Sequence, residues 1–366
     1  MADCVIERHP ERVSLTVAMT VVTPDPAAWD AFVEAHPDGH LLQSSQWGAL
    51  KGRFGWKPHL RAVVAGETIQ AGALALEKQR LALSALYVPR GPLFSGDPPI
   101  DALLLDDLIR LGRRRRAVFV RIEPNITEDD PRAATLHSFL LDRALQPTPP
   151  IQPRSTIHLD LTPEPERLLA GMSKGHRADI KRALREGVKV REGGTPADLD
   201  AFYAIMQATS ARAGFAIHSP AYYAAVLELF GDAVRLWLAE YRGAPVATAM
   251  TAVWGAMAIY LYSGSTTEGL QCGAQHAIQW RAIQWARARG AVRYDFWGIP
   301  DALGQAAAVA DPAARARLDA AAQHDPLYGV YRFKKGFGGI TTRYLPAYDQ
   351  IGMPLLYALW RQRVIG

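Results

Sequence analysis

The pattern of apolar and polar positions changes repeatedly between helical and strand spacing along the chain. Apolar residues three and four apart predict helices over residues 25–37, 41–55 and 100–116. Alternating or continuous apolar runs predict strands over residues 59–79, 84–94 and 117–124. The same order of strands and helices returns between residues 156 and 298. The pattern therefore predicts a mixed α/β (α+β) protein in which one fold occurs twice.

A proline-rich segment lies between the two copies. The stretch "QPTPPIQPRST", residues 146–156, holds four prolines in eleven residues, which is the composition of an extended connector. A chain of 366 residues also exceeds what one hydrophobic core usually organises. We therefore predict two domains with a boundary near residue 150.

Charge and cysteine content narrow the classes of function. The net charge of +5 favours an anionic partner. Cys4 and Cys272 form neither a disulfide framework nor a zinc site, so we expect a reducing cytoplasm and neither a metal nor another cofactor. The N-terminal residues lack the apolar core of a secretory signal, and apolar stretches such as 252–262 are too short to span a bilayer. Peripheral contact with a membrane surface stays open.

Six short motifs occur in a fixed order along the chain. They are "LLQSSQWGALK" (41–51), "YVPRGP" (87–92), "VRIEPN" (120–125), "RADIKRALREGVKV" (177–190), "YLYSGST" (260–266) and "YRFKKGFGG" (331–339). With these motifs the chain resembles the Fem family of aminoacyltransferases, which build the peptide cross-bridges of bacterial peptidoglycan. The resemblance covers roughly residues 17 to 350. The alanine-rich segment 301–325 is too short for the coiled-coil arm of some members, so the chain resembles the compact branch.

The resemblance implies two tandem acyltransferase domains of the type found in acetyl-CoA N-acetyltransferases (GNAT), with mixed sheets flanked by helices. Residues 1–16 would be a loose leader. Residues 17–150 with about 336–366 would form the first domain, because the end of the chain packs back on it, and residues 151–335 would form the second.

The activity that the resemblance implies is transfer of an amino acid from aminoacyl-tRNA to a stem-peptide amine of a peptidoglycan precursor, either UDP-MurNAc-peptide or lipid II. An N-acyltransferase that uses acyl-CoA is one alternative. The stretch "TTEGLQCGAQHAI" (266–278) lacks the arginine of the usual pyrophosphate loop and so disfavours it. A non-catalytic protein that binds tRNA or the precursor is another alternative. The oligomeric state does not follow from the sequence.

Three residues are catalytic candidates by resemblance. Phe333 and Lys334 match the family's pair that holds the tRNA end and the reacting carbonyl, where a cation would stabilise developing negative charge. The segment is expected to be a strand and turn, with Lys335 on the opposite side toward solvent or tRNA. Glu123 follows a strand and is either a general base or an orienting carboxylate, because the proton can also leave through the tRNA's vicinal hydroxyl.

Several residues are candidates for precursor binding. Lys51 would contact the diphosphate, or it is a solvated helix residue, and Arg90 would bind ligand or pair with a carboxylate. Tyr222 matches the family pattern, but His218 stands where the family has arginine. Either Arg212 substitutes for that arginine, or the carrier differs, or His218 is only a polar residue beside a helix cap.

Tyr262 is predicted to lie on a central strand and to face the cleft if Tyr260 faces the other way; alternatively, both tyrosines fill a core. A basic stripe with three- and four-residue spacing is the candidate for tRNA phosphates, and it consists of Lys174, Arg177, Lys181 and Arg185. The run "RRRR", residues 113–116, is by default a solvated helix end, with tRNA contact as a secondary option.

Overall fold

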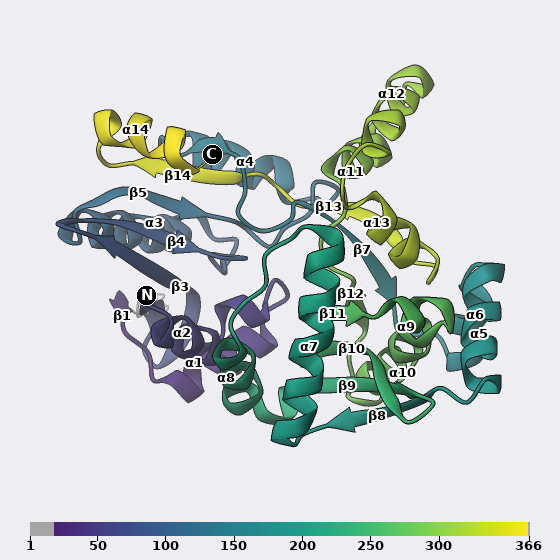
Figure 1. The fold of residues 1–366 in the computed structure, drawn as a ribbon. Coiled ribbons are helices and arrows are strands. Elements are labelled where there is room, and N and C mark those ends of the chain that lie inside the picture. Colours follow the sequence, from purple (N-terminus) through teal and green to yellow (C-terminus); the bar gives the residue numbers. More distant parts are fainter. Residues whose placement is uncertain (1–17, 365–366) are drawn as a thin grey trace, which may run out of the picture.

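The computed structural model describes residues 18–364, without the side chains of 360–364, and the leader predicted over residues 1–16 lies outside them. Two seven-stranded sheets organise the described part of the chain (Figure 1). The first runs in the order β1 (Met19–Val22), β2 (Lys57–Ala65), β3 (Thr68–Arg80), β4 (Leu83–Val88), β5 (Ala117–Ile122), β14 (Ala347–Ile351) and β6 (Gln146–Thr148). The second runs in the order β13 (Ile340–Arg343), β7 (Ser155–Asp160), β12 (Arg293–Asp295), β11 (Met257–Ser265), β10 (Ala244–Trp254), β9 (Val234–Tyr241) and β8 (Lys189–Gly193).

Helices flank both sheets, as the sequence predicts for an α/β protein. Around the first sheet lie α1 (Pro26–Ala35), α2 (Ser45–Arg53), α3 (Pro98–Arg114), α4 (Ala133–Leu141) and α14 (Pro354–Val364). With the second sheet come α5 (Pro165–Gly171), α6 (Lys174–Arg185), α7 (Pro196–Ala213), α8 (Pro220–Phe230), α9 (Thr267–Gln271), α10 (Ala274–Ala288), α11 (Asp301–Ala308), α12 (Pro312–Ala322) and α13 (Tyr328–Lys335). Short 3-10 turns occur at η1 (Leu41–Gln43) and η2 (Gly231–Ala233). Among the helices described here, none combines the length and the apolarity that crossing a membrane requires.

The two sheets share one connection pattern. Strands β1 to β4 are antiparallel, and the chain then crosses through α3 to β5, which runs parallel to β4. Strands β8 to β11 are likewise antiparallel, and the crossover through α9 and α10 leads to β12, which runs parallel to β11. A parallel pair needs such a crossover, and here each half supplies one. The recurrence predicted from the sequence is therefore present in the topology.

The chain passes between the sheets more than once. The first part of the proline-rich connector is β6, which pairs with β14, and the connector leads on to β7 in the second sheet. Near the C-terminus, β13 pairs with β7, and the next strand, β14, inserts between β5 and β6 in the first sheet. The domain limits near residues 150 and 336 stay a prediction. The C-terminal segment thus adds one strand to each sheet, β13 to the second and β14 to the first.

The segment "YRFKKGFGG" differs from the strand and turn predicted for it. Residues 328–335 form the helix α13, and the chain turns through Gly338, whose φ is +95°, before β13 begins. Helical spacing buries Lys334 and leaves Lys335 exposed. The alternation of an extended strand is thus wrong here, although the two lysines do face different ways.

One hydrophobic cluster joins the two halves of the protein. It contains Trp29, Trp47 and Leu74 from elements around the first sheet, and Phe202 and Tyr222 from α7 and α8. At the same contact between α2 and α8, one exposed ion pair joins Arg53 and Glu228. Burial of aromatic surface contributes far more to association than an exposed pair does. This cluster therefore packs α2 against α8.

Candidate active site

Lys334 lies on the last turn of α13 with its side chain buried. Its amino group donates hydrogen bonds to the backbone carbonyls of Gly298 (2.7 Å) and Trp297 (3.2 Å). Burial lowers the pKa of Lys334 to about 7, against the opposing attraction of Asp295. As an ammonium, Lys334 has three N–H donors, so these two bonds leave one for a ligand.

A pocket of about 520 Å³ opens beside this lysine. Its walls come from α13, β11, the loop after β12 and the end of α7. The lining includes Tyr260, Tyr262, Trp297, Phe333, Lys334, Arg212 and His276. The predicted catalytic residues Phe333 and Lys334 and the predicted binding residue Tyr262 thus border one space.

The turn that receives Lys334 is held by Asp295, the last residue of β12. Asp295 is fully buried and accepts hydrogen bonds from the Thr156 hydroxyl and from the Trp297 N–H (2.7 Å). Burial acts to raise the pKa of Asp295, but His158 and Thr156 outweigh it and hold this pKa below its ordinary value. Trp297 has a φ of +64°, which bulky residues rarely adopt. The charged carboxylate therefore stabilises a left-handed turn whose carbonyls orient the lysine.

A second group of predicted residues meets between α2 and α8. The Lys51 ammonium donates to the Tyr222 hydroxyl (3.3 Å) and lies 4.8 Å from the ring centroid of Trp47. Burial, followed by repulsion from Lys78, lowers the pKa of Lys51 to about 8. Lys51 is therefore a half-buried cation against aromatic rings rather than a fully solvated helix residue.

His218 stacks on Tyr222, with ring centroids 3.9 Å apart and an angle of 17° between the rings. It directly precedes Ser219, whose side chain caps α8. Burial and the nearby charge of Lys51 lower the pKa of His218, so the imidazole is largely neutral at pH 7. The residue thus lies beside a helix cap, as one alternative from the sequence has it, and it also stacks within the aromatic group; its contact with phosphate stays a prediction.

Tyr262 connects this group with the pocket. Its ring contacts those of His218 and Tyr223, and both of these rings also contact the ring of Tyr222. Residues two apart on a regular strand share a face, so alternation alone does not separate Tyr260 from Tyr262. A bulge between them, where pairing moves from Met250 to Thr251, places the two rings in different clusters.

Arg90 is buried at the junction of the two halves. Its guanidinium donates to the Pro153 carbonyl (2.8 Å) and lies 3.8 Å from the ring centroid of Tyr344. It does not line the pocket beside Lys334. These contacts favour a role in joining β4 to the connector and to the C-terminal segment.

Glu123 is buried directly after β5, and its carboxylate is fully engaged. It accepts hydrogen bonds from the Tyr87 hydroxyl (2.6 Å) and from the backbone N–H groups of Ile151 and Gln152. Burial raises the pKa of Glu123, while these donors act in the opposite direction. Like Arg90, it does not line the pocket that Lys334 borders. The geometry favours the orienting role over the general base.

The basic stripe lies on α6. Lys174, Lys181 and Arg185 are exposed, whereas the Arg177 guanidinium donates to the carbonyls of Ala170 and Met172 at the end of α5. A local role also applies to Lys335, which donates to the Gly339 carbonyl (2.9 Å). Three exposed cations of the stripe therefore remain as candidates for tRNA phosphates.

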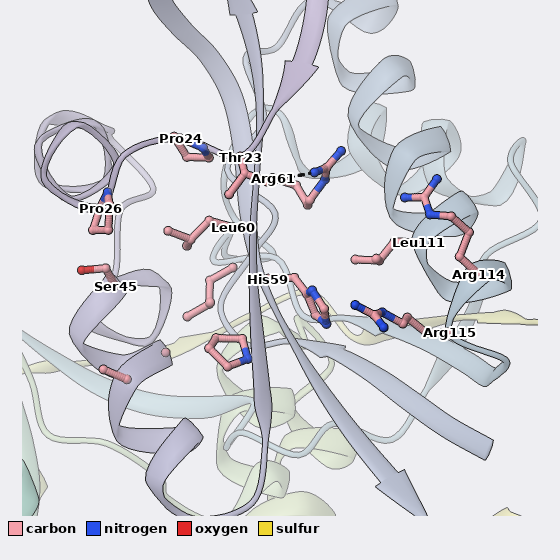
Figure 2. Close-up of a pocket in the computed structure, with 14 residues that line it drawn as sticks. Thr23, Pro24, Pro26, Ser45, His59, Leu60, Arg61, Leu111, Arg114 and Arg115 are labelled. Atoms are coloured by element: carbon pink, nitrogen blue, oxygen red, sulfur yellow. Dashed lines mark hydrogen bonds between the residues drawn. The ribbon is translucent and has the colours of Figure 1, made fainter. Parts of the chain in front are cut away.

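A different pocket, of about 770 Å³, lies at the edge of the first sheet (Figure 2). It forms where β1 leaves β2, between α2 and the end of α3, and His59, Arg61 and Arg115 border it. His59 and Arg115 bind Glu77, and Arg61 binds Asp107. None of the residues predicted for catalysis or precursor binding lines this pocket, so its size does not make it the active site.

Asp295 and Trp297 were not predicted as site residues. A signal for Asp295 is present in the sequence, because "VRIE" (120–123) and "VRYD" (292–295) end the corresponding strands β5 and β12 with an acidic residue. The turn at Trp297 has no such signal, since its φ depends on the buried carboxylate. His276, whose pKa burial and His176 lower to about 4, also lines the pocket without a predictive pattern.

Comparison with known proteins places these features in a family. A model described as the FemAB family matches residues 25–137, 144–244 and 239–362. A curated relative, the UDP-N-acetylmuramoylpentapeptide-lysine N(6)-alanyltransferase of Weissella viridescens, is 27% identical over 75% of this chain and 85% of its own. The lipid II:glycine glycyltransferase of Staphylococcus aureus strain USA300 is 23% identical over 91% of this chain and 93% of its own.

Two solved structures bear on the fold. The crystal structure of FemX matches with a TM-score of 0.80 at 20% identity, over 93% of this chain and 99% of that one. A tandem GNAT protein from the clavulanic acid biosynthesis pathway matches with a TM-score of 0.54 at 11% identity, over 91% and 98% of the two chains. The predicted tandem GNAT-like fold is thereby confirmed.

The pKa of Lys334 gives a pH dependence with a definite sign. Between about pH 7 and the ordinary lysine value of 10.5, the unfolded chain binds a proton that the folded chain lacks. We expect the unfolding free energy of the wild type, relative to Lys334→Met, to rise across this window by at most about 1.4 kcal/mol per pH unit. Urea unfolding of both proteins from about pH 6 to about pH 9 measures it. A pH-independent difference would contradict the lowered pKa.

Replacement of Glu123 tests how strongly it anchors the connector. Glu123→Ala leaves one hydroxyl and two backbone N–H groups without their acceptor, so we expect a loss of about 1–3 kcal/mol in unfolding free energy. Glu123→Gln keeps a carbonyl oxygen for the backbone donors and should lose less. Glu228→Ala, which breaks an exposed ion pair, is the control and should cost under about 1 kcal/mol. Equal losses in all three variants would remove the anchoring role.

Proposed function

The chain belongs to the FemAB family, and we propose that it transfers an amino acid from aminoacyl-tRNA to a stem-peptide amine of a peptidoglycan precursor. The observation that carries this proposal is the pocket beside Lys334, because a lysine with a pKa of about 7 borders it and Tyr262 links it to the Lys51 group. The names of the two curated relatives describe transferases that act on such precursors. These substrates would place the reaction in the cytoplasm.

The pocket between α13 and β11 is suited to the donor. Phe333 and Trp297 offer aromatic surface against which the terminal base of a tRNA can stack. Arg212 at the pocket and the exposed cations of α6 can meet phosphates of the acceptor end. This division leaves Lys334 at the ester that joins the amino acid to the ribose.

The group around Lys51 is suited to the acceptor. A diphosphate carries two charged groups that a partly desolvated ammonium attracts more strongly than a solvated one does. The rings of Tyr222 and His218 form a stack beside it that can contact an apolar or aromatic part of the carrier. Tyr262, whose ring contacts the His218 ring that stacks on Tyr222, would lie between the two bound substrates.

The proposed reaction is aminolysis of an ester. The acceptor amine attacks the ester carbonyl, a C–N bond forms, and the C–O bond to the ribose breaks. Charged Lys334 stabilises the negative charge that develops on the carbonyl oxygen, an effect worth about 3–4 kcal/mol for one such donor. The proton of the amine reaches the leaving ribose oxygen through the neighbouring hydroxyl. In this scheme Glu123 holds the connector and takes no proton. If Glu123 were the general base, its replacement would slow turnover about a hundredfold or more.

The direct test supplies both proposed substrates. Purified protein is incubated with radiolabelled aminoacyl-tRNA and with UDP-MurNAc-peptide or lipid II, and label is followed into each acceptor. We expect label in at least one acceptor, and a fall of about a hundredfold or more in turnover for Lys334→Met. Lys335→Met is the matched control and should retain most activity, because Lys335 is exposed and bonds only to its own segment. Label in neither acceptor, together with turnover of an acyl-CoA, would favour the N-acyltransferase alternative.

His218 tests which carrier the acceptor site accepts. A guanidinium in place of the neutral imidazole would add a charged phosphate contact, so we expect His218→Arg to lower KM for UDP-MurNAc-peptide by about tenfold. His218→Gln supplies no charge and should leave this KM near that of the wild type. Steady-state kinetics at fixed aminoacyl-tRNA measure both. An unchanged KM in His218→Arg would leave His218 as a residue of the helix start only.

A further inference from the structure

Three segments that are distant in sequence meet at one end of the first sheet. The Ser84 N–H donates to the Arg116 carbonyl (3.2 Å), which places the turn between β3 and β4 beside the end of α3. The Met353 N–H donates to the Val118 carbonyl (3.1 Å), which places the start of α14 beside the start of β5. A small hydrophobic cluster with Tyr357 of α14 and partly buried Leu83 joins them. These contacts bring the turn, the end of α3 and the start of α14 together at this end of the sheet.

Leucine side chains project from this surface into solvent. Leu81, at the tip of the turn between β3 and β4, is 91% exposed. On α14, Leu355 is 86% exposed and Leu359 is 60% exposed, while Tyr357 packs inward. Leu355 and Leu359 are four residues apart and therefore lie on one face of the helix. We call Leu81, Leu355 and Leu359 the leucine patch.

Exposed arginines accompany the leucine patch. Arg80 directly precedes Leu81. Arg113, Arg114 and Arg116 come from the end of α3 and the turn after it. All four side chains are exposed. Arg115 differs, because it pairs with Glu77, although both Arg114 and Arg115 border the pocket of Figure 2. We call Arg80, Arg113, Arg114 and Arg116 the arginine group. The helix end explains only some of it, because Arg80 lies on a strand.

We propose that the leucine patch and the arginine group form a docking surface for an anionic lipid membrane. Exposed leucines can enter the boundary between headgroups and acyl chains, and arginines nearby can bind lipid phosphates. Nucleic acid would use the arginines but not the leucines, and a purely apolar partner would use the leucines but not the arginines. The combination therefore selects a lipid surface.

The docking surface is separate from the proposed active site. Its residues belong to the first sheet's outer end and to α14, and none of them borders the pocket beside Lys334. The inference does not depend on the proposed function, because vesicle binding needs no turnover. If both hold, the surface would concentrate the enzyme where a lipid-linked acceptor resides.

The test is sedimentation of the full-length protein with vesicles. Vesicles of phosphatidylcholine alone are compared with vesicles that contain one-third phosphatidylglycerol, at low and at high salt. We expect binding to the anionic vesicles that weakens with salt. Leu355→Ser with Leu359→Ser should weaken it by about tenfold or more, and Arg113→Gln with Arg114→Gln should weaken it by about fivefold or more.

Matched controls are available on the second half of the chain. Leu184→Ser with Leu270→Ser removes two leucines of similar exposure, and Arg289→Gln with Arg317→Gln removes two exposed arginines. These variants should bind vesicles like the wild type. Thermal unfolding of each variant separates loss of binding from loss of folding.

Several outcomes would overturn the inference. They are absence of binding to anionic vesicles at low salt, equal effects in the control variants, and leucine variants that bind normally. Arginine variants that lose tRNA binding but keep vesicle binding would assign the surface to RNA instead. Transfer to a soluble UDP-linked acceptor should be unchanged in the variants of the leucine patch. Failure of this inference and failure of the proposed function therefore remain distinguishable.

Discussion

The placement of the candidate catalytic lysine depends on the buried carboxylate of Asp295. This group ties β12 to β7 through Thr156 and holds the N–H of Trp297, so that the chain turns with a positive φ just where the sheet ends. The carbonyls of that turn then receive Lys334. A buried charge is costly unless donors surround it, and here hydroxyl, amide and imidazole groups do so. The cost is compensated within the same structure that orients the lysine.

Two different kinds of contact bring the second group of side chains to this turn. A shared aromatic cluster packs α2 against α8, and a single bulge in β11 directs Tyr262 toward that cluster while Tyr260 faces the other core. The ring contacts of His218 with both Tyr222 and Tyr262 then link the surroundings of the two lysines. Burial lowers the pKa of Lys51 and of Lys334 alike, but to different extents, so the two cations differ most near neutral pH.

Local sequence patterns predicted the helices and strands whose ends are determined by residues close by in the sequence. The helix behind Ser44 and the strand ending at Glu123 follow from capping and apolar spacing. The segment around Lys334 could not be assigned in this way, because Lys334 is buried against the carbonyls of Trp297 and Gly298, which lie 37 and 36 residues earlier in the sequence. The partner of Arg121 is Asp349, 228 residues away, which no local pattern encodes. The motifs identified Phe333, Lys334 and Tyr262, whereas the role of Asp295 appears only when the two copies of the fold are compared.

The insertion of β14 between β5 and β6 has a consequence for biosynthesis. Until β14 leaves the ribosome, β5 has no neighbour on one side and β6 has none at all in the first sheet. The first sheet therefore cannot be completed before the second half has been synthesised, although domains usually fold in order of synthesis. An exposed strand edge persists through that interval, and such edges promote pairing with other chains. Emergence of β14, rather than synthesis of the first half, is the event that completes the first sheet.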